Sequence, residues 1–240
     1  MEHTIELKFG HKDKKGVLHK EVTFGRRLTV GDLIEIDSDP QSQSPTQHND
    51  LIRRRAMTKF GKLRMPPATS VLLELNKIDR DDIALAYERF VAKGRGKLKG
   101  DVLPGNIVKL IFGFEIAGVR YHLAEMNRLT TGYDEVAADT LGVDGVAREC
   151  FMLGRRISKL TNQDNPDLTI EGPIDLAAFQ PLDGDDLHCL REGGRYAEAF
   201  FRITGGAVPE EGDGENGADP DEGNRNDGSG DPESPKETAE

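Results

Sequence analysis

The chain contains one sequence plan twice, and this internal repeat limits its fold more than any other feature. Ile5–Gly10 (IELKFG) is similar to Val108–Gly113 (VKLIFG), and Arg27–Asp32 (RLTVGD) is similar to Arg128–Asp134 (RLTTGYD). Three more matches keep the same order, at offsets of 101 to 104 residues. They are Gly16-Val17 with His19 against Gly118-Val119 with His122, Arg54-Arg55 against Arg155-Arg156, and Ile78–Ile83 against Leu182–Leu187. The matches predict a tandem duplication; the alternative is one domain of about 200 residues with coincidental similarities.

Residues 94–105 (GRGKLKGDVLPG) separate the two copies. Their four glycines and one proline predict a flexible connector between a first unit, residues 1–93, and a second unit, residues 106–204. The glycines and lysines superficially resemble a phosphate-binding loop, but the Gly-Lys-Ser/Thr ending is missing. We therefore interpret the segment as a basic connector.

Each unit is predicted to be an α+β domain, a β-hairpin followed by about three helices. Ile5, Leu7 and Phe9 alternate with polar residues, which is typical of a strand with one buried face. Residues 107–114 and 119–126 predict the same hairpin in the second unit. Thr29 and Thr130 are expected to cap a short helix in each unit, because each hydroxyl precedes carboxylates in the first turn.

The charge of −11 is unevenly distributed. Residues 205–240 carry 12 acidic and 2 basic side chains, whereas residues 1–104 have a balance of +5 and residues 105–204 a balance of −6. The last 36 residues contain almost no large apolar side chain, so we expect a disordered acidic tail. It would serve solubility, or it would shield a basic surface on the first unit.

Composition excludes several functional classes. The nearly neutral body is not that of a strongly basic protein, so no nucleic-acid partner is expected. No apolar run is long enough for a membrane span, and no signal peptide is expected. Cys150 and Cys189 have no metal-binding spacing and are interpreted as buried thiols in a reducing compartment, which predicts a cytoplasmic protein.

No pattern of catalytic, metal-binding or cofactor-binding residues emerges, so we predict a protein that is not an enzyme and carries no cofactor. The Asp-rich segments lack the spacing of a calcium loop, and Asp79 and Asp183 are interpreted as helix N-caps. His19 and His122 are expected at the same repeat position on an exposed strand face. His188 beside Cys189 has no third partner at a recognisable spacing.

The repeat unit resembles the small tail assembly chaperones of Mu-like and related phages. The similarity depends on the hairpin, on Arg26–Leu33 (RRLTVGDL) and on Leu75–Phe90 (LNKIDRDDIALAYERF). Arg128–Glu135 (RLTTGYDE) also resembles the baseplate hub assembly chaperones of contractile phages. The resemblance covers residues 4–92 and 106–202. Members of the family usually have one unit, and the acidic tail is not part of their pattern.

The resemblance implies a non-enzymatic chaperone in the host bacterial cytoplasm that binds the tape-measure or baseplate hub protein during tail assembly. The tail tube protein is a further candidate partner, and a structural component retained in the tail or baseplate is the alternative function. An apolar groove in each unit would receive partner helices, although core packing would explain the same apolar residues. The basic run Arg53–Arg55 is either a solvated helix face or a contact for an acidic partner. The candidate partner-binding residues are Leu33, Ile36, Arg53, Arg54, Arg55, Tyr87, Phe90, Tyr196, Phe200 and Phe201.

Overall fold

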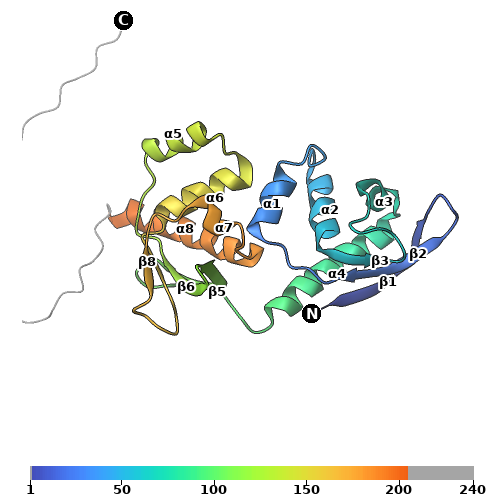
Figure 1. The fold of residues 1–240 in the computed structure, drawn as a ribbon, viewed down its shortest axis with the longest axis horizontal. Helices are drawn as coiled ribbons and strands as arrows, with labels where there is room; N and C mark the ends of the chain where they lie inside the picture. Colours follow the sequence, from blue (N-terminus) through green and yellow to red (C-terminus); the bar gives the residue numbers. More distant parts are fainter. Residues whose placement is uncertain (1, 205–240) are drawn as a thin grey trace, which may run out of the picture. The chain divides into compact units, whose positions relative to one another are not determined.

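The computed structural model describes residues 2–204 and confirms the α+β class (Figure 1). The predicted acidic tail, residues 205–240, lies outside the described residues. The first half contains three strands and four helices, one helix more than expected. In order, these are β1 (His3–Lys12), β2 (Leu18–Phe24), α1 (Val30–Asp37), α2 (Pro45–Ala56), β3 (Met57–Phe60), α3 (Thr69–Glu74) and α4 (Lys77–Arg95).

The second half follows a similar order and ends on the longest described helix. Its 3-residue first strand lies within the segment predicted to be a flexible connector, because residues 101–103 pair antiparallel with residues 107–109. The elements are β4 (Asp101–Leu103), β5 (Ile107–Ile116), β6 (Val119–Glu125), α5 (Gly132–Leu141), α6 (Gly145–Arg156), β7 (Lys159–Thr161), β8 (Thr169–Glu171), α7 (Leu176–Phe179) and α8 (Gly184–Thr204).

Both sheets are antiparallel, and both hairpins contain an irregularity at the same place. The strand orders are β1-β2-β3 and β4-β5-β6-β7-β8. In the first hairpin, pairing stops after Glu6 and resumes at His11; in the second it stops after Lys109 and resumes at Phe114. Each interruption leaves the backbone N–H groups of a short segment free to bond outside the sheet.

One long helix packs on each sheet and closes a separate apolar core. Helix α4 contacts β1, and helix α8 contacts β5. Leu7, Phe24 and Phe90 belong to the first core, while Phe114 and Phe179 meet edge to face in the second, with ring centroids 5.0 Å apart. Each half therefore has its own core, built on its own sheet and long helix.

The first turn of α1 nevertheless contributes to the second core. Val30 is fully buried there, and its N–H donates to the carbonyl of Leu182 at 2.7 Å. Thr29 forms an isolated antiparallel bridge with Asp183. The two halves, over the described residues 2–204, accordingly group as one compact unit.

Several sequence predictions need correction at the level of single residues. The helix cap in the second half is Thr131 instead of Thr130, and Asn76 caps α4 while Asp79 lies in its first turn. His19 is buried and faces His11, whereas the corresponding pair in the second hairpin is Phe114 with Tyr121. His122 therefore does not occupy the position of His19. Among residues 2–204, no helix has the length and hydropathy needed to cross a membrane.

Candidate partner-binding site

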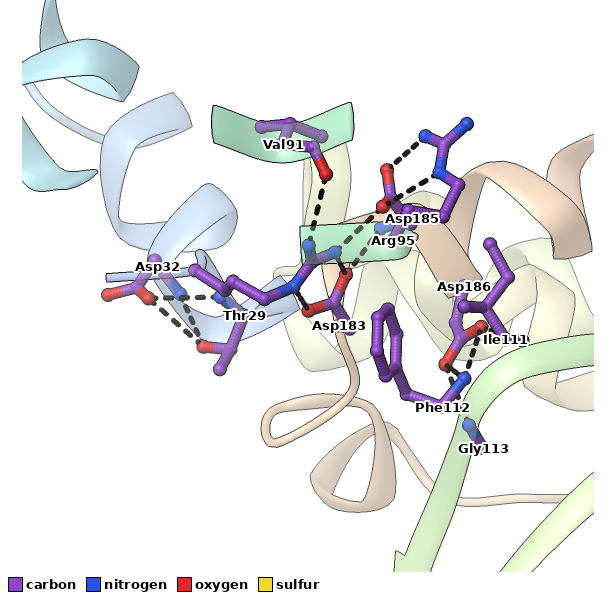
Figure 2. Close-up of polar contacts among 11 residues, drawn as sticks. Thr29, Asp32, Val91, Arg95, Ile111, Phe112, Gly113, Asp183, Asp185 and Asp186 are labelled. Carbon is purple, nitrogen blue, oxygen red and sulfur yellow. Dashed lines mark hydrogen bonds and ion pairs between the residues drawn. The ribbon is translucent and has the colours of Figure 1, made fainter. Parts of the chain in front are cut away.

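Ion pairs between one arginine of the first half and two aspartates of the second half join the two halves of the chain. Arg27 Nε donates to Asp183 Oδ2 at 2.7 Å, and its Nη2 donates to Asp183 Oδ1 at 2.8 Å and to Asp185 Oδ2 at 2.7 Å. Arg95 Nη2 donates to Asp185 Oδ1 at 2.7 Å. Figure 2 shows both carboxylates in this network. A bidentate pair of this kind is geometrically specific, so it fixes the register of the contact.

The surroundings of Arg27 hold its guanidinium in place. Its Cζ lies 4.5 Å from the centre of the Phe112 ring, and Nη1 donates to the carbonyl of Val91. Hydrogen bonding to Asp183 and Asp185 raises the pKa of Arg27, although partial burial opposes the shift. Arg27 is therefore a permanent positive charge at this position.

The pKa of Asp185 reflects two opposing causes. Burial alone would raise it, but the hydrogen bonds and positive charges of Arg95 and Arg27 outweigh burial and lower the pKa below the ordinary value of 3.8. Asp185 is thus ionised at neutral pH.

A cavity of about 410 Å³ lies beside this network. Apolar side chains of α1, α2 and α4 line it, and charged groups surround them. Burial, followed by the negative charge of Asp185, raises the pKa of Tyr87 to about 12, so its phenol remains protonated. The lining residues are Arg27, Leu28, Leu33, Asn49, Ile52, Arg53, Ala84, Tyr87, Glu88, Phe90, Val91, Asp183, Gly184 and Asp185.

The structure brings part of the predicted set together. Leu33, Arg53, Tyr87 and Phe90 all line this cavity. Ile36 is buried in the first core and borders a smaller cavity of about 110 Å³, which Arg54 and Arg55 also line.

The predicted residues of the second half lie elsewhere, on α8. Tyr196 is exposed, whereas Phe201 is buried in the second core. Phe200 packs against that core, with its ring centroid 5.9 Å from that of Phe201. None of the three lines the large cavity.

The basic run on α2 is paired within the chain. Arg53 bonds to Asp50 at 3.2 Å, Arg54 donates to the hydroxyl of Thr69, and Arg55 bonds to Asp32 at 3.1 Å and pairs with Glu35. The charges of Arg53 and Arg55 are therefore partly compensated within the chain, whereas Arg54 bonds to a neutral hydroxyl.

The sequence prediction missed the structural role of one aspartate in each long helix. Asp79 accepts hydrogen bonds from the backbone N–H groups of Lys8 at 2.9 Å, Phe9 at 3.3 Å and Gly10 at 2.7 Å. Asp186 accepts the equivalent bonds from residues 111–113, at 2.5, 3.0 and 2.8 Å. Each carboxylate occupies the strand irregularity and ties the long helix to the sheet.

Glycine is required at the end of both irregularities. Gly10 has φ of 77° and Gly113 has φ of 83°, and a Cβ atom on either would lie 2.5 Å from a carbonyl oxygen of the paired strand. The recurrence of a glycine at this place in both hairpins was visible in the sequence. Its aspartate partner was not, because about 70 residues separate the two.

The described residues show no arrangement suited to metal chemistry. Across residues 2–204, no group of three or more His, Cys, Asp or Glu side chains could hold a metal ion. Burial raises the pKa of Cys150 to about 12 and that of Cys189 to about 11, so neither is a ready nucleophile at neutral pH.

Comparison of the chain with protein-family models, with curated proteins and with solved structures gives no match.

Proposed function

We propose that this chain is a non-enzymatic assembly chaperone of a tailed phage, built from two copies of one hairpin-and-helix unit. Its partner is an amphipathic helix of the tape-measure or baseplate hub protein. The cavity beside Arg27 carries the proposal, because it offers apolar side chains next to charges of both signs.

The duplication is supported by matching contacts. Strands β1 and β5 have 10 residues each, and β2 and β6 have 7 each. The Thr29–Asp32 capping box on α1 corresponds to the Thr131–Asp134 capping box on α5. Asp79 and Asp186 bind the same three positions of their hairpins. Such matches follow directly from a common unit.

The cavity fits the anchor side chains of a helix. Leu33, Ile52 and Tyr87 supply apolar surface, while Arg53 and Glu88 provide charges at its border. An amphipathic helix presents apolar anchors at positions i, i+3 and i+4 between polar residues, which matches this distribution. A volume of about 410 Å³ accommodates a few side chains and leaves the rest of the helix outside.

Co-expression with the tape-measure protein of the same phage tests the proposal. The wild-type chain is expected to increase the soluble fraction of that protein. Ala84→Arg places a long side chain in the cavity and is expected to abolish the increase. Leu85→Arg is the matched control, because Leu85 is the next residue on α4, is exposed and does not line the cavity. An unchanged soluble fraction with the wild-type chain would contradict the proposal.

Retention in the tail or baseplate is the alternative function. Mass spectrometry of purified particles distinguishes the two. A chaperone is absent from particles, whereas a structural component is present in fixed stoichiometry with the tube.

A further inference from the structure

The junction between the two halves is a docking contact between a donor face and an acceptor face. The donor face is the start of α1 with the residues before it, 27–34. The acceptor face is the segment that leads into α8 together with the start of that helix, residues 180–185. The N–H of Gly31 donates to the carbonyl of Gln180 at 3.0 Å, and the N–H of Gly184 donates to the carbonyl of Leu28 at 3.1 Å. The free N–H groups at the helix start thus find acceptors in the other half.

The side chains of the donor face are covered by the same contact. Val30 is buried in the second core, and Ile34 packs against that core. Arg27 pairs with Asp183 and Asp185. Helix α1 also contacts α6, where Asp37 Oδ2 accepts the N–H of Val146 at 2.9 Å.

The second half has an equivalent donor face, and within residues 2–204 its apolar side chains are exposed. Alignment of the capping threonines Thr29 and Thr131 places Leu129 at the position of Arg27, Tyr133 at that of Gly31 and Val136 at that of Ile34. Tyr133 is 89 % exposed, Val136 63 % and Leu129 52 %.

Tyr133 and Val136 are three residues apart on α5 and share one side of the helix start, and Leu129 lies in the segment that precedes the helix. In the described part of the chain, the N–H groups of Gly132 and Tyr133 donate to no acceptor, whereas those of Val30 and Gly31 do. Exposed apolar side chains beside open backbone donors are typical of an unfilled docking face.

The first half has the equivalent acceptor face, and two of its apolar residues are exposed in the part of the chain that the structure describes. Alignment of Asp79 with Asp186 places Leu73 at the position of Gln180 and Ile78 at that of Asp185. Leu73 is 45 % exposed and Ile78 is 50 % exposed.

The two open faces match each other in chemistry. Within the chain, Arg27 of the donor face meets Asp185 of the acceptor face. At the equivalent positions both members are apolar, Leu129 on the donor face and Ile78 on the acceptor face. The Arg27–Asp185 contact is thus replaced by a pair of apolar residues, while Asp183, the bidentate partner of Arg27, corresponds to Asn76, the N-cap of α4.

We propose that the donor face on α5 docks onto the acceptor face before α4 of a second copy of this chain, repeating the internal junction between molecules. The contact is head to tail, so one molecule retains a free donor face and the other a free acceptor face. Repetition of the contact builds a ring if the rotation closes and a filament if it does not. The internal junction identifies the occupant, because it shows the complementary face that this surface binds. The inference rests on the equivalence of the two halves and is independent of the tape-measure partner.

Light scattering and sedimentation velocity of the full chain test the proposal, at concentrations up to about 1 mM. The wild-type mass is expected to rise with concentration in steps of 26.4 kDa. Tyr133→Asp removes the donor face, and Ile78→Asp removes the acceptor face. Both substitutions place a carboxylate in the first turn of a helix, where it is compatible with the helix dipole. Leu168→Asp, at an exposed loop residue outside both faces, is the control.

Each variant alone is expected to remain monomeric, and the control is expected to associate like the wild type. An equimolar mixture of the two variants is expected to form a dimer of one chain of each kind and nothing larger, because only one intact donor face and one intact acceptor face remain. A wild-type chain that is monomeric throughout the range, or a mixture without the mixed dimer, would overturn the proposal. The co-expression test with Ala84→Arg addresses a different surface, so either proposal can fail without the other.

Discussion

Asp186 Oδ2 accepts a hydrogen bond of 2.8 Å from the backbone N–H of Gly113, and Asp79 Oδ2 accepts one of 2.7 Å from that of Gly10. These two bonds join the start of each long helix to the irregular part of its first strand. Both aspartates are fully buried. Each carboxylate therefore fixes the start of its helix to one point of the sheet, beside the apolar contacts of the core.

Asp79→Ala and Asp186→Ala are each expected to lower the free energy of unfolding by about 3 kcal/mol, because three backbone donors lose their acceptor inside the protein. Urea denaturation monitored by circular dichroism measures the change. Asp82→Ala is the matched control, since Asp82 is exposed on α4. Losses equal to that of the control would show that the carboxylates do not anchor the helices.

Arg27→Ala is expected to destabilise the junction, because Asp183 and Asp185 both lose their shared partner. The expected loss is about 2 kcal/mol, as for a partly buried, hydrogen-bonded ion pair. Arg120→Ala removes an exposed pair with Glu115 and should cost at most about 1 kcal/mol. Urea denaturation compares the two variants. If Arg27→Ala lowered the free energy of unfolding no more than Arg120→Ala does, the network would not stabilise the junction.

Because the pKa of Asp185 is lowered in the folded protein, the stability of the junction decreases in acid. A carboxyl group whose pKa is lower in the folded state stabilises the protein above its ordinary value of 3.8, and the contribution is lost as the pH falls through the folded pKa. Asp185→Asn should therefore reduce stability at neutral pH and flatten the loss of stability in acid. Urea titrations between pH 7 and about 3 measure both effects, with Asp82→Asn as control. Identical pH profiles for Asp185→Asn and the wild type would exclude this contribution.

The thiols are expected to be unreactive in the folded protein. Burial raises the pKa of Cys189 from 9.0 to about 11, which lowers the thiolate fraction about a hundredfold at pH 8, and the effect on Cys150 is larger. Reaction with a coloured disulfide reagent should be slow in buffer and fast in urea, with Cys189 ahead of Cys150. Fast reaction of both thiols in the folded state would contradict their raised pKa values.

The sequence predicted the hairpins and the fold class because apolar alternation is a local property. Leu7 is buried as the alternation requires, but Phe9 is exposed, since the strand becomes irregular between Glu6 and His11. Asp79, 70 residues later, binds the backbone at that place. A contact of this range leaves no local pattern, so the irregularity could not be predicted.

The long sequence separation of these contacts also explains why the sequence comparison matched the wrong aspartates of the two halves. The sequence matched Asp79 with Asp183 because both begin similar Asp-rich runs. In the structure Asp186 makes the backbone contacts that correspond to those of Asp79, and the N-cap of α4 is Asn76. An asparagine and an aspartate are both good caps, so similarity of residue type gave an alignment that was wrong by three residues.

The candidate site was only partly predictable. Leu33, Tyr87 and Phe90 were selected as apolar residues on helices, and all three line the cavity. Arg27 was not selected, because its partners Asp183 and Asp185 are more than 150 residues away. Only the folded chain shows that these charges meet beside the apolar surface.

Direct binding of a tape-measure fragment, measured by isothermal titration calorimetry, tests the central claim most closely. The fragment would be an amphipathic helical segment of the tape-measure protein of the same phage, titrated into the purified full chain. We expect saturable binding that Ala84→Arg abolishes and Leu85→Arg leaves unchanged. Absence of binding to any such segment, or equal binding by both variants, would contradict it.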